Sequence, residues 1–124
     1  MKKFILFLGI ALLAFTTYAQ EAKIEFKKDT IDYGVIKKGS DGVRIFTFTN
    51  TGDAPLVITG VKSSCGCTIP EKPKQPIQPG AEGVIKVKYD TNRVGEFFKT
   101  TYVSSNAGGT KKIIIKGRVE NDQP

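Results

Sequence analysis

Hydrophobic and polar residues alternate along most of this chain with a period of two. Ile85, Val87 and Tyr89, for example, are separated by Lys86 and Lys88. This period sends successive side chains to opposite faces of a strand, and no stretch repeats convincingly at the 3.6 residues of a helix. The positions that share one parity in the other runs are Ile24 and Phe26; Ile31, Tyr33 and Val35; Phe46 and Phe48; Leu56, Ile58 and Val61; Phe97, Thr101 and Val103; and Ile113, Ile115, Gly117 and Val119.

Turn residues separate these runs. Segments 38–42, 50–55, 78–80 and 106–109 are rich in Gly, Asn, Asp and Pro. Gly and Asn accept positive φ, and Pro pre-sets a turn. About seven short strands joined in this way predict an all-β fold, an immunoglobulin-like antiparallel β-sandwich.

Two segments are predicted to lie outside the strands. Segment 72–76 contains two prolines, which lack the N–H that a central strand needs, so we expect a rigid loop there. Residues 120–124 are expected to form a frayed tail. The domain is not of the antibody type, because the chain has no Trp and its two cysteines are too close in sequence to join two sheets.

The pattern also separates covered strands from exposed ones. In segment 97–105, Phe98 and Tyr102 lie on the parity opposite to Phe97, so we expect cover on both faces of this strand. The shorter segment 24–28 carries charged neighbours. We therefore predict that it is an exposed edge, which could accept a partner strand through main-chain hydrogen bonds.

The N-terminus has the pattern of a secretory signal peptide. Two lysines precede an apolar run of twelve residues, 4–15, and small residues then lead to Ala19. We expect cleavage between Ala19 and Gln20, which divides the chain into a signal peptide, 1–19, and one sandwich domain, 20–124. The alternative is a retained membrane anchor, but spanning needs about 20 apolar residues. The residue directly after the cleavage site is not a cysteine, so no lipid anchor is indicated. The predicted location is periplasmic or secreted.

The composition limits the classes of partner that we expect for this protein. Removal of the signal peptide lowers the formal charge from +7 to +5, because Lys2 and Lys3 leave with it. The remaining lysines are spread along the chain, which favours a solvated basic face over a nucleic-acid site. We expect no nucleic-acid partner, and no transmembrane segment after cleavage.

Most catalytic chemistry is excluded. The chain has no histidine, which removes Ser-His-Asp and Cys-His nucleophilic sites and histidine-based metal centres. Gly108-Gly109-Thr110-Lys111 lacks the spacing of a phosphate-binding loop and is interpreted as a hairpin turn. We expect no catalytic residue and no cofactor.

Cys65-Gly66-Cys67 is the distinctive segment. In an extended strand these Cα atoms lie about 6.6 Å apart, near the upper limit for a disulfide, so a bond needs a bend that Gly66 permits. Such a bond closes a tiny loop and stabilises the fold by only about 1.6 kcal/mol in the chain-entropy treatment. This favours a reducible pair over a structural staple. We expect both side chains near solvent, at a strand end that leads into the proline-rich loop.

Three interpretations of the pair remain open. Cys65 and Cys67 could be packing residues or a minor local disulfide. They could perform thiol–disulfide exchange, with Lys62 nearby to favour a thiolate. They could bind a metal, although two ligands suit Cu(I), or a metal shared by two chains, better than structural zinc. In an oxidising compartment we expect the two cysteines to be bonded to each other.

Several segments together resemble a known bacterial family, domain of unknown function 1573. The matching segments are 32–36, 46–52, 55–58, 63–68, 77–80, 95–106 and 115–117. The most specific is Ser64-Cys65-Gly66-Cys67-Thr68, in its place after a Leu-x-Ile strand. The family is common in Bacteroidetes. The resemblance implies a fold similar to immunoglobulin-like domains of the pilus-chaperone and sperm-protein type, an exported or periplasmic location, and no established activity.

These observations predict an exported, non-enzymatic binding or assembly module. Its partner is expected to be another exported or envelope protein, bound through a strand edge or loops. The alternative function is a thiol–disulfide or soft-metal handling protein that uses Cys65 and Cys67.

Overall fold

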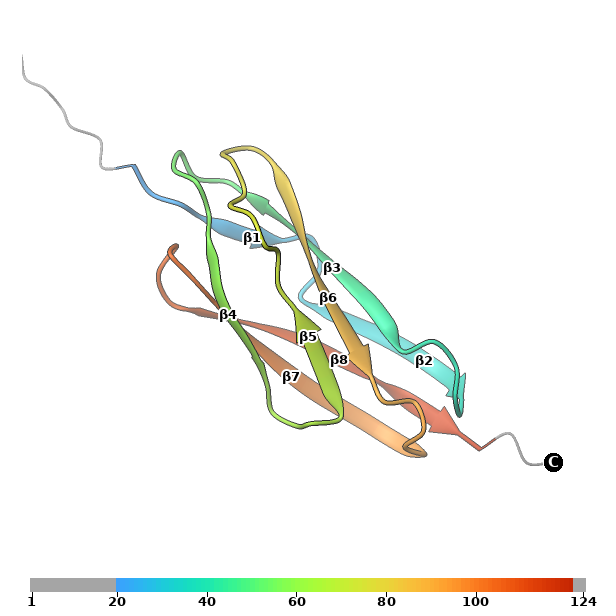
Figure 1. The fold of residues 1–124 in the computed structure, drawn as a ribbon. Coiled ribbons are helices and arrows are strands. Elements are labelled where there is room, and N and C mark those ends of the chain that lie inside the picture. Colours follow the sequence, from blue (N-terminus) through green and yellow to red (C-terminus); the bar gives the residue numbers. More distant parts are fainter. Residues whose placement is uncertain (1–19, 122–124) are drawn as a thin grey trace, which may run out of the picture.

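Eight strands and no helix make up the regular structure of residues 20–121, which are the residues that the computed structural model describes. The predicted signal peptide, 1–19, lies outside them. The strands form two sheets packed face to face (Figure 1). The strands are β1 (Ile24–Phe26), β2 (Thr30–Lys37), β3 (Val43–Asn50), β4 (Ile58–Ser63), β5 (Thr68–Glu71), β6 (Glu82–Tyr89), β7 (Gly95–Ser105) and β8 (Thr110–Glu120).

The strand order confirms the immunoglobulin-like sandwich. One sheet has the order β1-β3-β6-β5 and the other the order β2-β8-β7-β4, so the first two strands belong to different sheets. All pairs are antiparallel except β2 with β8, which is parallel. The structure has one strand more than the seven that the sequence pattern predicted, and the additional strand is β5. It is short and contains Pro70, which an edge strand tolerates.

The core lies between the sheets and follows the predicted parity. Four strands and one connection supply the side chains that are at most 1% exposed. The hydrophobic ones among them are Phe46, Phe48, Leu56, Ile85, Val87, Val103, Ile113, Ile115 and Val119. Strand β6 shows the alternation most clearly, because its residues are exposed and buried in strict turn.

Strand β2 departs from its predicted parity at Gly34. The register against β8 shifts between Asp32 and Val35, and Gly34 has φ +66°, a conformation that glycine adopts without strain. The Asp32 carboxylate accepts a hydrogen bond from the Gly34 N–H at 2.8 Å. Tyr33 therefore points into the core, while Val35 is turned outward and is 66% exposed. The expected inward position of Val35 is wrong.

Strand β7 is covered on one face only. It lies between β8 and β4, so it is not an edge, as predicted. Phe97 is buried, but Phe98 is 62% exposed and Tyr102 is 38% exposed. Within residues 20–121, nothing covers the outer face of this strand, and the prediction of cover on both faces is wrong.

The remaining predictions of local structure are mostly confirmed. Segment 72–76 contains no strand, and β1 is an edge strand. The Gly108-Gly109 turn joins β7 to β8 with positive φ at both glycines. Glu120 was expected in a frayed tail, but it pairs with Lys37 and ends β8.

Asn50 ties together the end of the sandwich opposite to the cysteines, and it is 0% exposed. Its Oδ1 accepts hydrogen bonds from the N–H groups of Lys23 and Gly52, at 3.3 and 3.0 Å. Its Nδ2 donates to the carbonyl oxygens of Ala54 and Ile77, at 2.7 and 3.0 Å. One amide thus joins the start of β1, the turn after β3 and the approach to β6.

Candidate functional site

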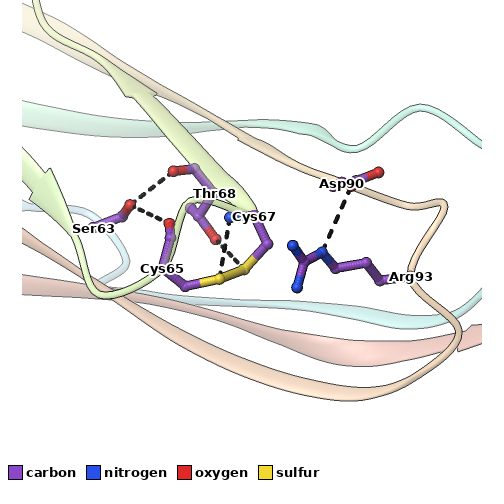
Figure 2. Close-up of a disulfide and its surroundings, with 6 residues drawn as sticks. All are labelled: Ser63, Cys65, Cys67, Thr68, Asp90 and Arg93. Atoms are coloured by element: carbon purple, nitrogen blue, oxygen red, sulfur yellow. Dashed lines mark hydrogen bonds and ion pairs between the residues drawn. A yellow bond between two sulfur atoms is a disulfide. The ribbon is translucent and has the colours of Figure 1, made fainter.

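The Cys65-Gly66-Cys67 segment forms the turn between β4 and β5, where the chain crosses from one sheet to the other (Figures 1 and 2). The expectation that it leads directly into the proline-rich loop is wrong, because β5 lies between them. A disulfide joins the two sulfur atoms, and the Cα atoms lie 5.2 Å apart. Gly66 does not have positive φ, so the bend does not depend on a conformation reserved for glycine.

The two cysteines differ in burial. Cys67 is 2% exposed and belongs to the hydrophobic core, whereas Cys65 is half-buried and packs against that core. The expectation that both side chains lie near solvent is therefore wrong for Cys67. The reason is its position directly before β5, whose first residue, Thr68, is also buried.

Hydrogen bonds fix the backbone around the disulfide. The Ser63 hydroxyl lies 2.7 Å from the carbonyl oxygens of both Cys65 and Thr68, so its proton serves the two acceptors (Figure 2). The Thr68 N–H donates to the Cys65 carbonyl at 3.2 Å, and the Asp90 N–H donates to the Cys67 carbonyl at 2.8 Å. The Cys67 N–H donates to Sγ of Cys65 at 3.1 Å.

The charged groups near the turn differ from those that we predicted. Lys62 is opposite Tyr102 in the register of β4 and β7, and both residues are exposed on the outer face of their sheet, away from the core that contains Cys67. Arg93 forms an ion pair with Asp90, with Nε and Oδ2 3.6 Å apart, and Figure 2 draws its guanidinium on the side of the disulfide. The predicted support of a thiolate by Lys62 has no basis in this arrangement.

An aromatic cluster fills the core at this end of the sandwich. Tyr89 stacks on Phe97 with ring centroids 3.9 Å apart, and Tyr33 meets Phe97 edge-on at 5.1 Å. The Tyr33 hydroxyl donates to the Gly42 carbonyl at 2.7 Å, and the Arg44 guanidinium lies 4.0 Å from the Tyr33 ring centroid. Burial raises the pKa of Tyr33 to about 12, with Arg44 lowering it in part, and burial also raises the pKa of Tyr89.

A hollow of about 470 Å³ opens beside the disulfide. The loop 39–42 and the loop after β6 form its walls, and Gly66, Cys67 and Tyr89 are among the residues that line it. Between residues 20 and 121 there is no cluster of three or more Cys, Asp or Glu side chains that could bind a metal ion, so no third side chain of these types joins the two cysteines in such a cluster. In the disulfide, neither sulfur is the thiolate that binds a metal.

A second candidate surface is the outer face of the sheet β2-β8-β7-β4. We call it the aromatic face and define it by Val35, Phe98, Tyr102 and Ile114. The first three are exposed and Ile114 is half-buried. A hollow of about 580 Å³ lies between Val35 and Phe98, with Asp32, Glu96, Lys116 and Arg118 around it. The sequence pattern contained Phe98 and Tyr102 but did not reveal that their side of the strand stays open.

Across residues 20–121, no helix has the length and apolar character needed to cross a membrane.

The fold is similar to several solved structures. One is the crystal structure of a protein of unknown function from Porphyromonas gingivalis W83, with a TM-score of 0.71 and 17% identity over 86% of this chain and 51% of that chain. This chain therefore spans about half the length of that protein. A second is the human CEP192 ASH / PapD-like domain 7, with a TM-score of 0.69 and 9% identity over 83% and 89% of the two chains.

A third similar structure is a chain of the CsuC-CsuE chaperone-tip adhesion subunit pre-assembly complex of Acinetobacter baumannii. Its TM-score is 0.60, with 13% identity over 80% of this chain and 58% of that chain. At these identities the likeness concerns the fold alone. A sequence search of curated proteins finds no match.

The architecture is thus an immunoglobulin-like sandwich, similar in fold to the CEP192 ASH / PapD-like domain. Its sequence matches the family described as "Protein of unknown function (DUF1573)" over residues 24–119. The chain belongs to this family, and the resemblance inferred from its motifs is confirmed.

Proposed function

We propose that this protein is an exported, non-enzymatic binding module, and that the aromatic face is where it contacts another exported or envelope protein. The observation that carries the proposal is the exposure of Phe98 on a central strand, beside exposed Val35. Contiguous apolar surface of this kind marks interaction sites. The chain similar in fold in the chaperone–tip adhesion subunit complex is an example of such a sandwich in a complex with another protein.

The layout of the face suits a protein partner. Phe98 and Tyr102 are four residues apart on one strand, which places them about 13 Å apart, with Ile114 and Thr100 between them. Charged groups surround the apolar positions, because Lys116 is opposite Phe98 and Arg118 is ion-paired with Glu96 at 3.7 Å. An apolar centre with a polar rim and a hollow for an inserted side chain is the anatomy of protein interfaces.

The opposite face is less suited to this role. The outer face of β1-β3-β6-β5 carries the exposed aliphatic residues Ile45, Ile69 and Val84. Lys86 is opposite Ile45 and Lys88 is opposite Ile69, just as Lys116 is opposite Phe98 on the aromatic face. Lysines flank the apolar residues of both faces, so the aromatic residues are what distinguishes them. No aromatic residue is exposed on it within residues 20–121, and aromatic residues are the ones enriched at interfaces.

The predicted β1 edge is a second possible contact surface. The Lys27 N–H donates to the Thr47 carbonyl of β3, and the Lys23 carbonyl accepts from the N–H of Thr51, just after β3. The main-chain groups of Ile24 and Phe26 therefore point outward. This edge is only three residues long and offers few hydrogen bonds. We therefore favour the aromatic face.

The exported location rests on the predicted signal peptide. Mass spectrometry of the protein from its native host is expected to find Gln20 at the mature N-terminus, and an intact chain retained in the membrane fraction would contradict export by cleavage.

A matched pair of double variants tests the binding surface. Phe98→Ser with Tyr102→Ser removes the aromatic side chains, and Ile45→Ser with Val84→Ser removes two exposed apolar side chains from the other face. Burial of one such aromatic contributes about 1.5–3 kcal/mol, so the first variant should bind a native envelope partner at least about tenfold more weakly. The control should bind as the wild type does. An equal effect of the two variants would refute the assignment.

A further inference from the structure

Hydrogen bonds hold the backbone of the disulfide turn independently of the sulfur–sulfur bond. The hydroxyl of Ser63 bridges two carbonyls, and the N–H groups of Thr68 and Asp90 bind the carbonyls of Cys65 and Cys67. The Ser64 N–H also donates to the Thr100 carbonyl at 3.2 Å. None of these bonds involves sulfur, so we expect the turn to keep its shape when the disulfide is broken and the two thiols to stay close enough to rejoin.

The turn is also open to an approaching molecule at one point. Gly66 is exposed, and a Cβ atom placed on it would meet no atom within 4 Å. Since Gly66 does not have positive φ either, neither backbone conformation nor crowding demands glycine here. The missing side chain leaves this exposed position of the turn open, directly beside Cys65 in the chain.

The two sulfur atoms are not equivalent. Cys67 is 2% exposed, whereas Cys65 is half-buried. The Cys67 N–H donates to Sγ of Cys65 at 3.1 Å, so the two residues lie in one tight turn. Cys65 therefore belongs to the more accessible of the two residues, and access is one of the factors that decide which sulfur a thiolate attacks.

We propose that Cys65–Cys67 is a thiol–disulfide exchange site, with Cys65 as the sulfur that bonds to the substrate. Its substrate class is a thiol, either of a small molecule or of a cysteine in a peptide, that approaches the half-buried Cys65 at the turn beside exposed Gly66. This activity is separate from binding at the aromatic face and does not depend on it.

The exchange proceeds in two balanced steps. A substrate thiolate attacks Sγ of Cys65 and forms a mixed disulfide, and the electron pair of the broken bond leaves with Sγ of Cys67, which takes a proton from water. A second substrate thiolate then attacks the substrate sulfur of the mixed disulfide and releases Cys65. Two thiols are thereby oxidised to one disulfide, and the protein disulfide is reduced to two thiols.

The first test locates the mixed disulfide in the wild-type protein. Oxidised protein is incubated with reduced glutathione, quenched with acid and treated with N-ethylmaleimide, and fragment mass spectrometry then reads the two cysteines separately. The expected product carries glutathione on Cys65 and maleimide on Cys67. Glutathione mainly on Cys67, equal amounts on both, or no reaction of the folded protein would overturn the proposal.

The second test uses the open glycine. Gly66→Val adds a branched side chain to the exposed residue between the two cysteines, and Gly60→Val is its control, because a Cβ at Gly60 also meets nothing within 4 Å. We expect glutathione to react with Gly66→Val about tenfold more slowly than with Gly60→Val, at the same urea midpoint of unfolding. Equal rates would overturn the proposed route of approach. If either variant does not fold, the location of the wild-type adduct decides alone.

Discussion

Replacement of Asn50 by alanine tests the account of how the sandwich is tied together at the end opposite to the cysteines. The change removes four hydrogen bonds at a side chain that is 0% exposed. The Ile77 carbonyl keeps the N–H of Leu56 as a partner at 2.8 Å. The N–H groups of Lys23 and Gly52 and the carbonyl of Ala54 lose the bonds that Asn50 gave them.

The expected loss follows from these three groups. Each buried polar group left without a partner costs about 1–3 kcal/mol. Because water can reach part of this turn, whose residue Asp53 is exposed, we take the lower end of that range and expect a loss of about 3–4 kcal/mol in the free energy of unfolding. Urea unfolding followed by circular dichroism measures this loss.

Asn106 provides the matched control. Its Oδ1 accepts from the Val57 N–H at 2.8 Å and its Nδ2 donates to the Pro55 carbonyl at 3.0 Å, so it binds the residues that directly follow Ala54, a partner of Asn50. Asn106 is exposed, and water replaces its bonds when they are lost. Asn106→Ala should cost about 1 kcal/mol or less. If it costs as much as Asn50→Ala, burial does not set the value of these bonds and the reasoning fails.

Three further predictions test other parts of the structure. Phe46→Ala should lower the free energy of unfolding by about 3–5 kcal/mol and Ile115→Ala by about 2–5 kcal/mol, as measured by urea unfolding. Phe98→Ala should lower it by less than about 1 kcal/mol. Similar losses for all three variants would show that the core has been assigned to the wrong residues. The pKa of Tyr33 is about 12 when folded and about 10 when unfolded, so stability should fall as the pH rises from 10 to 12. That fall should be shallower in Tyr33→Phe, and identical pH profiles would contradict the burial of the phenol. Phe26→Pro removes one outward N–H of β1 and should leave partner capture unchanged if it still folds, whereas lost capture would favour the β1 edge.

The alternating pattern predicted the sandwich because most strands here have one buried and one exposed face. It predicted the inward positions of β6 and β8 correctly, since Ile85, Val87, Ile113 and Ile115 follow a strict period of two. It failed at Val35, because a bulge at Gly34 shifts the parity and a single glycine does not reveal a bulge. It also missed β5, because four residues that include a proline carry too weak a signal.

The sequence identified the cysteines of the candidate site but not the residues and the solvent exposure around them. The pairing of Cys65 with Cys67 follows from their spacing. The burial of Cys67, the outward position of Lys62 and the open side of Phe98 depend on how strands distant in sequence are placed. The same holds for Asn50, whose partners lie as many as 27 residues away and which was interpreted only as a turn residue.

Crosslinking in the envelope of living cells tests the central claim, that the aromatic face contacts a partner. The photoreactive residue p-benzoylphenylalanine is introduced in place of Phe98, and in a separate variant in place of Ile45, which is exposed on the outer face of the other sheet. We expect one defined crosslinked protein from position 98 and none from position 45. Crosslinks of equal yield from both positions, or a defined product from position 45 alone, would contradict the claim.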